Sequence, residues 1–391
     1  MNDKIKLKDA CKILNGFAFK SGKYVDSGIR IIRIANVQKG YVEDERPTFY
    51  PNSEESSIRD YMLEEDDLLL SLTGNVGRVA LLDKRWLPAA LNQRVACLRI
   101  KDDRIIKDYL YFALLSDKFE NDCTESSKGI AQKNMSTEWL KDYEIPLPSR
   151  QKQREIISSL KQLSMIIKNK TEQIQQLDDL IKARFVEMFG DKDETKISDY
   201  IDSLEAGKSL AGTEKCENKV LKTSAVSYDY FDVSQTKYLP KDYRPVDAHK
   251  VNPGNIVISR MNTIELVGAA AYVWNVPDKI YLPDRLWKAK IKNDANPIFV
   301  WQTIIHPKTK ELIRRIAGGT SGSMKNISKS KFLEMPVKKA TREEQDQFAI
   351  FVTQIDKSKF VLSNELTMCN FYIRLIHDRV MHSCINLRVA Q

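Results

Sequence analysis

Apolar residues recur at heptad spacing in two long stretches of the chain, residues 150–189 and 342–381. Steps of 3, 4 and 7 residues between them are the a/d pattern of a coiled coil. In the first stretch these positions are Ile156, Leu160, Leu163, Ile167, Ile174, Leu177, Ile181 and Met188. In the second they are Phe348, Val352, Ile355, Leu362, Leu366, Cys369, Ile373, Ile376 and Val380. Neither seam can be buried by its own helix, so the pattern predicts two long helices that pack on each other.

Capping signals mark the ends of both stretches. Thr341 and Glu344 predict a capping box at the start of the second helix, and Ser149 predicts a cap for the first, which Gly190 ends. A helix of about 40 residues is roughly 60 Å long, which is long for a compact domain and indicates a spacer. The alternative is that both helices form the core of a bundle.

The stretches that precede the two helices are also repeated, with several offsets of 190 to 192 residues. Each contains a buried strand (68–71 and 256–259), a polar loop, a strand ending in Ile-Lys (100–101 and 291–292), a helix (106–116 and 297–315), a Gly/Ser-rich loop (126–134 and 318–326) and a closing strand (144–146 and 334–336). Such self-similarity indicates a duplication. We predict an α+β fold in which two globular domains (1–149 and 191–340) alternate with two long helices (150–190 and 341–391) as a pseudo-twofold repeat.

Composition narrows the class of protein. Apolar residues make up 42% of the chain, which is enough for cores, and no run of about 18 apolar residues suggests a membrane span. The six cysteines are scattered without a CxxC, and the N-terminus has no apolar signal core, so we expect reduced thiols, a cytoplasmic protein and no zinc. The net charge of +9 permits a nucleic-acid partner without proving one.

The sequence lacks the motifs of the common nucleotide-dependent enzymes. It has no GxxxxGK[ST], no GxGxxG and no Asn-Pro-Pro-Tyr-type signature of amino-methyltransferases. Neither a paired-acid nuclease motif nor a Ser/His/Asp or Cys/His pairing stands out. We therefore expect no catalytic residue, no metal and no cofactor on this chain.

Basic and amide side chains are instead concentrated in glycine-bearing loops. Arginine reads guanine and asparagine or glutamine reads adenine by bidentate hydrogen bonds, whereas lysine and serine more often hold phosphate. The candidate DNA-binding residues are Lys20, Asn75, Arg78, Arg94, Lys128, Gln132, Lys133, Asn134, Lys208, Arg260, Asn262, Arg285, Ser321, Ser323, Lys325 and Asn326. The alternative is that these loops are only solvated, or that the asparagines cap adjacent helices.

Several segments resemble the specificity subunits of type I restriction-modification enzymes. They are LKD–NGFAF (7–19), IIRIANV (31–37), EEDDLLLS followed by Gly-Asn-x-Gly (64–77), and IPLP followed by Gln153 and Ile156. The resemblance implies a subunit without catalytic activity, whose two recognition domains each read half of a split DNA target. It also implies an antiparallel coiled coil that sets the gap between the half-sites.

The resemblance further implies partners for the chain. Two methyltransferase subunits would dock on the helices and use S-adenosylmethionine for adenine-N6 methylation, and restriction subunits that use ATP and Mg would join this core. We also weigh a subunit of a methylation-only or other multi-subunit system, a coiled-coil assembly scaffold that never reads DNA, and a methyltransferase or nuclease in its own right.

Overall fold

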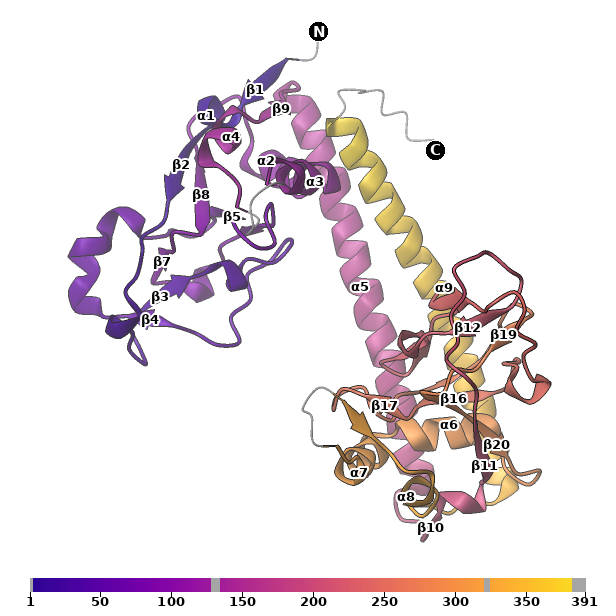
Figure 1. Ribbon diagram of the computed structural model, residues 1–391. Coiled ribbons are helices and arrows are strands. Elements are labelled where there is room, and N and C mark those ends of the chain that lie inside the picture. The colour runs from indigo at the N-terminus through magenta and orange to yellow at the C-terminus, as the bar shows by residue number, and fades with distance from the viewer. Residues whose placement is uncertain (1–2, 128–133, 320–323, 382–391) are drawn as a thin grey trace. The chain divides into compact units, whose positions relative to one another are not determined.

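The computed structural model describes residues 3–127, 134–319 and 324–381 (Figure 1). Contacts divide the chain into two compact units, the first formed by residues 1–171 with 363–391 and the second by residues 172–362. Helices α5 (Arg150–Phe189) and α9 (Arg342–Met381) each contribute to both units. The two stretches with heptad spacing, 150–189 and 342–381, are confirmed as helices, whereas the division into four domains, including a C-terminal helix over 341–391, stays a prediction.

The first unit is built on two small sheets. The larger sheet is antiparallel, with strand order β2-β8-β5-β6, and the smaller has the order β4-β3-β7 with β3 and β7 parallel. The strands are β1 (Lys4–Lys6), β2 (Cys11–Asn15), β3 (Ile29–Ile32), β4 (Phe49–Tyr50), β5 (Leu68–Ser71), β6 (Val79–Leu81), β7 (Ala89–Leu91), β8 (Val95–Ile100) and β9 (Glu144–Pro146), which pairs with β1. The helices besides the long ones are α1 (Leu7–Ala10), α2 (Lys107–Leu114), α3 (Asp117–Ser126) and α4 (Thr137–Asp142).

The second unit repeats this topology. Its larger sheet has the order β11-β20-β16-β18, and its smaller sheet has the order β15-β12-β19 with β12 and β19 parallel. The strands are β10 (Glu194–Lys196), β11 (Ile201–Ala206), β12 (Lys219–Leu221), β13 (Val226–Ser227), β14 (Tyr230–Phe231), β15 (Thr236–Tyr238), β16 (Ile256–Ser259), β17 (Met261–Asn262), β18 (Ala270–Tyr272), β19 (Ile280–Tyr281), β20 (Leu286–Ile291), β21 (Lys325–Asn326) and β22 (Pro336–Lys338). The helices are α6 (Pro297–Ile305), α7 (Pro307–Ile316) and α8 (Lys329–Leu333). In both units a run of strands that form a mainly antiparallel sheet precedes most of the shorter helices, which is the α+β class.

Three predicted elements differ from the structure. The single helix expected at 297–315 is two helices, because His306 is extended (ψ 137°) and Pro307 has no N–H to continue a helix. The closing strand expected at 334–336 begins at Pro336 instead. The Gly/Ser-rich loop expected from Ser126 begins later, because Ser126 still belongs to α3; residues 128–133 lie outside the described part of the chain.

The predicted seams are buried or partly buried along both long helices. In the first unit, Ile156 and Leu160 of α5 belong to a cluster that Val380 and Ile376 of α9 complete. In the second unit, Ile181 of α5 shares a core with Phe348 and Val352 of α9. Ion pairs also join α5 to α9 within each unit. Lys170 pairs with Glu365 in the first unit, and Asp178 pairs with Lys359 (2.5 Å) in the second. Within each unit the two helices therefore contact each other in antiparallel directions.

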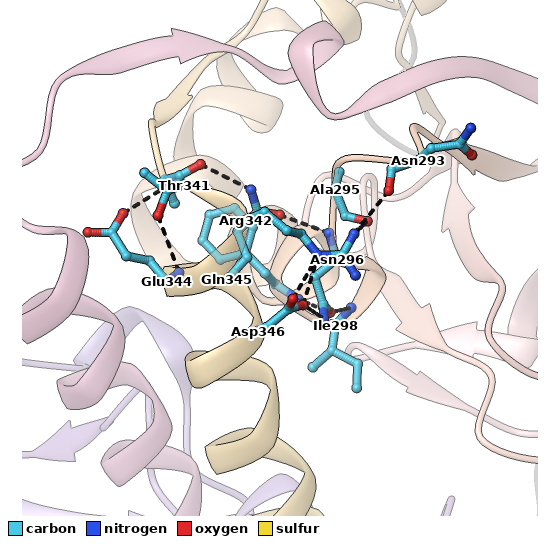
Figure 2. Close-up of polar contacts among 11 residues, drawn as sticks. Asn293, Ala295, Asn296, Ile298, Thr341, Arg342, Glu344, Gln345 and Asp346 are labelled. Atoms are coloured by element: carbon cyan, nitrogen blue, oxygen red, sulfur yellow. Dashed lines mark hydrogen bonds and ion pairs between the residues drawn. The ribbon is translucent and has the colours of Figure 1, made fainter.

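A buried glutamine joins each globular fold to a long helix. In the second unit, Gln345 accepts a hydrogen bond from the backbone N–H of Asn296 (2.8 Å; Figure 2) and donates one to the carbonyl of Ala340 (3.0 Å). Arg342 adds bonds to the carbonyls of Asn293 and Ala295, both 3.1 Å. Since Asn296 immediately precedes α6, the start of α6 is fixed to the start of α9.

The first unit repeats this junction 192 residues earlier. Gln153 accepts from the N–H of Ile106 (2.8 Å), which precedes α2, and donates to the carbonyls of Arg104 and Pro148 (2.8 and 2.9 Å). The caps expected at the two helix starts are confirmed. Thr341 and Glu344 exchange both bonds of a capping box (Figure 2), and the hydroxyl of Ser149 accepts from the N–H of Lys152.

Candidate nucleic-acid interface

Three segments meet where the central strand of the first unit ends. Strand β5 ends at Ser71, and the next residue, Leu72, donates its N–H to the carbonyl of Arg94 (3.0 Å). The carbonyl of Leu72 accepts from the N–H of Met135 (2.8 Å), and Thr73 forms a bridge with Asn134. The loop that carries Asn75 and Arg78, the turn that carries Arg94, and the segment at Asn134 are therefore neighbours.

The second unit has the same arrangement. Arg260 follows β16, donates its N–H to the carbonyl of Arg285 (3.2 Å) and accepts from the N–H of Ile327 (3.0 Å). The pairing of β17 with β21 places Asn262 opposite Lys325 and Met261 opposite Asn326. Arg94 and Arg285 thus occupy equivalent places 191 residues apart, as do Asn134 and Asn326 at 192.

In each unit a fourth segment, which contains a glycine, packs closely against the turn that carries the exposed arginine. A Cβ on Gly16 would lie 2.1 Å from the carbonyl oxygen of Asn92, and one on Gly207 would lie 1.9 Å from that of Leu282. Neither contact is possible with a side chain, so only glycine allows this approach. Lys20 and Lys208, which follow these glycines closely, extend the same end of each unit.

The candidate side chains differ in their freedom to bind a partner. The exposed ones are Lys20, Asn75, Arg94, Asn134, Lys208 and Arg285. Others are held within the protein: Arg78 donates to the amide oxygen of Gln38, and the guanidinium of Arg260 lies over the Trp287 ring, 5.7 Å from its centre. Asn262 donates to the Ser259 hydroxyl (3.3 Å), and Lys325 donates to the carbonyl of Gly319 (2.8 Å).

Two groups of candidates remain to be placed. The side-chain oxygen of Asn326 is buried and has no hydrogen-bond partner among the described residues, which leaves it as an acceptor at the base of the β17–β21 pair. Lys128, Gln132, Lys133, Ser321 and Ser323 lie outside the described residues. Contact of any of these candidates with DNA stays a prediction.

The buried thiols in the first unit have an apolar packing role. A Cβ on Gly77 would lie 2.9 Å from the Cβ of Cys123, so this cysteine packs directly against the glycine-rich loop. Burial raises the pKa of Cys123 and of Cys97, and it raises that of Cys11 to about 12. These thiols are therefore neutral at physiological pH, and neutral thiols are poor nucleophiles and poor metal ligands. Within the described ranges no three His, Cys, Asp or Glu residues gather as a metal site would require.

Comparison with known proteins shows a likeness to one family over the first part of the chain. Residues 2–178 match the family model described as the type I restriction modification DNA specificity domain. These residues make up less than half of the chain, so the likeness to the type I specificity domain is shown for this part of it. The matching residues include the whole β5–β6 loop, the Arg94 turn and Asn134, which form the candidate interface of the first unit.

Individual members of the type I specificity-subunit family show the same likeness. The MjaVIII specificity subunit of Methanocaldococcus jannaschii is 27% identical over 178 residues, which are 44% of this chain and 42% of that protein. The EcoAI specificity subunit of Escherichia coli is 31% identical over 163 residues, or 40% and 27% of the two chains. The chain thus covers less than half the length of these relatives.

A solved structure extends the likeness to the fold of the whole chain. The type I restriction-modification S subunit from M. genitalium aligns with a TM-score of 0.54, covering 97% of this chain and 96% of that one. At 14% sequence identity the match concerns the fold alone. No described helix combines the length and the apolar character that crossing a membrane requires.

Proposed function

We propose that this chain is the non-catalytic DNA-specificity subunit of a type I restriction-modification complex, and that each globular domain reads one half of a bipartite target. The proposal rests on one arrangement that both units contain, around Leu72 in the first unit and around Arg260 in the second. In each unit a central strand ends between a turn that carries an exposed arginine and a segment that carries an asparagine. Two such sites with different loop sequences suit two different half-sites.

The long helices act as the ruler in this proposal. They pair as an antiparallel coiled coil along their seams, a view supported by the contacts between α5 and α9 inside each unit. Each helix is roughly 60 Å long. Half-sites read from one face of a duplex lie about 34 Å apart, or one helical turn. Rigid linkage of two weak readers raises their joint affinity and makes the gap part of the specificity.

The same helices provide the docking surface for partner subunits. Large apolar side chains that the seams do not use remain exposed on them, among them Met165 and Val186 on α5 and Phe360 and Phe371 on α9. Exposed apolar groups of this kind mark protein interfaces. Two methyltransferase subunits would cover them and bring S-adenosylmethionine, and restriction subunits would bring ATP and Mg. The chain itself binds none of these cofactors, and the complex works in the cytoplasm.

The exposed apolar residues on the helices also favour a second candidate, an assembly scaffold that never reads DNA. Sequencing of methylated sites in cells that express the chain with its methyltransferase subunits separates the two. The DNA-specificity function predicts two half-sites at a fixed gap, whereas a scaffold gives no defined bipartite site.

A paired deletion tests the ruler. Removing residues 168–171 from α5 together with 364–367 from α9 shortens both helices by about 6 Å, so the preferred gap should shrink by about two base pairs while the half-sites stay the same. The control replaces residues 168–171 with alanine and keeps the length. An unchanged gap in the deletion variant would contradict the ruler.

A further inference from the structure

Each unit carries a short hairpin at the same place in its fold, which we name the tyrosine hairpin. In the first unit it spans residues 37–42, where Val37 bridges Val42 and the N–H of Gln38 donates to the carbonyl of Tyr41 (3.0 Å). In the second it is the β13–β14 pair, where Val226 lies opposite Phe231 and Ser227 opposite Tyr230. Tyr41 and Tyr230 are equivalent, 189 residues apart, and are 55% and 71% exposed.

Both hairpins adjoin the candidate interface. In the first unit the N–H of Gly40 donates to the carbonyl of Val79, the first residue of β6 (2.8 Å), and Gln38 accepts from Arg78 in the loop before it. In the second unit the N–H of Ala270, the first residue of β18, donates to the carboxylate of Asp229 (2.9 Å). The tyrosine hairpins therefore lie beside the candidate interface. Each contacts the first residue of the strand that follows the interface loop, which is β6 in the first unit and β18 in the second.

An ion pair holds the tip of each hairpin on a helix, with opposite polarity in the two units. In the first unit Lys39 contacts Asp117 (2.6 Å) and Glu120 (2.7 Å) of α3. In the second unit Asp229 contacts Lys310 of α7 (2.8 Å), and the lysine is buried. The anchoring residues stand at neighbouring positions of the two tips, since the offset of 189 relates Lys39 to Tyr228 and Gly40 to Asp229, and both tips are held on a helix by an ion pair.

The tip of the second hairpin is held in a strained backbone conformation. Tyr228 and Asp229 have φ values of 51° and 63°, in the left-handed region that favours glycine, and Gly40 occupies this part of the first hairpin with φ 94°. Tyr228 is 83% exposed, so packing within its own unit does not account for a bulky residue there. A two-residue hairpin turn of type I′ requires positive φ at both central residues, so the turn itself accounts for the backbone and presents the exposed Tyr228 at its tip.

We propose that Tyr41 and Tyr230 contact the sugar–phosphate backbone of the two DNA half-sites, each hydroxyl donating a hydrogen bond to a phosphate oxygen. The inference rests on the proposed function. The interface loops differ between the units, as reading different bases requires, whereas the tyrosine is present in both. What two unlike half-sites share is their backbone, and tyrosine is among the residues that commonly bond to phosphate.

The test uses the full chain assembled with its methyltransferase subunits. Tyr41→Phe and Tyr230→Phe remove only the hydroxyls, and binding is measured for the cognate duplex, a duplex with one half-site altered and an unrelated duplex. Each variant should lose about fivefold in affinity for every duplex, and the double variant about 25-fold. Because the hydroxyl is uncharged, the salt dependence of binding should stay the same.

Tyr243→Phe is the matched control, since it removes a hydroxyl from a half-buried tyrosine that packs at the smaller sheet of the second unit. Thermal melting verifies that all variants fold. Wild-type affinity in the double variant would overturn the inference, as would a loss confined to the cognate duplex, which indicates base reading. Loss of methyltransferase subunits from the complex would also overturn it, assigning the hairpins to a protein partner. Absence of bipartite binding by the wild-type complex would instead remove the proposed function itself.

Discussion

Replacing Gln345 with methionine should loosen the attachment of the second unit to α9. Methionine is also unbranched and similar in size, so it fills the same space, but it can neither accept from the N–H of Asn296 nor donate to the carbonyl of Ala340. Gln345 is only 2% exposed, so water cannot readily replace the lost partners. The substitution therefore leaves one buried donor and one buried acceptor unsatisfied.

The size of the effect follows from the cost of such groups. A buried polar group without a partner costs about 1–3 kcal/mol, so two of them should lower the free energy of unfolding of the second unit by about 3 kcal/mol, after allowing for the apolar gain from methionine. For a domain of this size that corresponds to a fall in Tm of about 6–12 °C. Gln153→Met strips partners from three groups, Ile106 N–H and the carbonyls of Arg104 and Pro148, and should cost more.

Calorimetry of the full chain and hydrogen exchange at the Asn296 amide measure the two consequences. Exchange at that amide should accelerate in Gln345→Met, because its acceptor is gone. Gln347→Met is the control, since Gln347 is exposed on the same helix. A Gln345→Met chain that melts within about 2 °C of Gln347→Met would refute the reasoning.

Two further predictions concern charged groups in the first unit. Arg99 makes a two-pronged contact with the buried carboxylate of Asp67 (2.8 and 2.7 Å), so Arg99→Met should destabilise the unit by about 3–5 kcal/mol in urea denaturation; an effect no larger than that of the surface variant Arg85→Met would contradict this. Burial lowers the pKa of His377 from 6.5 to about 4, so the folded state favours the neutral ring. The contribution of the neutral ring to the free energy of unfolding is therefore fully present above pH 6.5 and is lost as the pH falls toward 4. The free energy of unfolding should fall by about 2 kcal/mol between pH 7 and pH 5 in the wild-type chain, and this fall should be absent in His377→Phe. Equal falls in the two proteins would exclude this role of His377.

The course of both long helices and three of their four ends could be predicted from the sequence because their signals are local. Heptad spacing sets their course, and Ser149, the Thr341–Glu344 box and Gly190 mark their ends. The single helix expected at 297–315 was wrong because its apolar periodicity continues through Pro307, although the missing N–H of this proline ends one helix and starts the next. Helix α3 is acidic and has little apolar periodicity, so its sequence does not indicate a helix, and the glycine and serine residues near its end indicate a loop from Ser126.

The meeting of the candidate residues depends on tertiary pairing, which a sequence shows only indirectly. The offsets of 191 and 192 residues could relate Arg94 to Arg285 and Asn134 to Asn326, but not show that both lie beside the end of the central strand. Nothing in the sequence near Gln38 predicts that it binds Arg78. A signal did exist for the glutamine junction, since Gln153 and Gln345 each stand three residues before the first apolar seam position.

The exchanged polarity of the hairpin anchors restricts how the two halves of such a gene can recombine. A crossover that moved the hairpin of one half without its helix would take the carboxylate of Asp229 away from Lys310 and bring Lys39 near it, or would bring Asp229 near Asp117 and Glu120. Like charges at that distance repel each other, and Lys310 is buried. New specificities made by shuffling would therefore inherit the segment from the hairpin through its helix as one indivisible block.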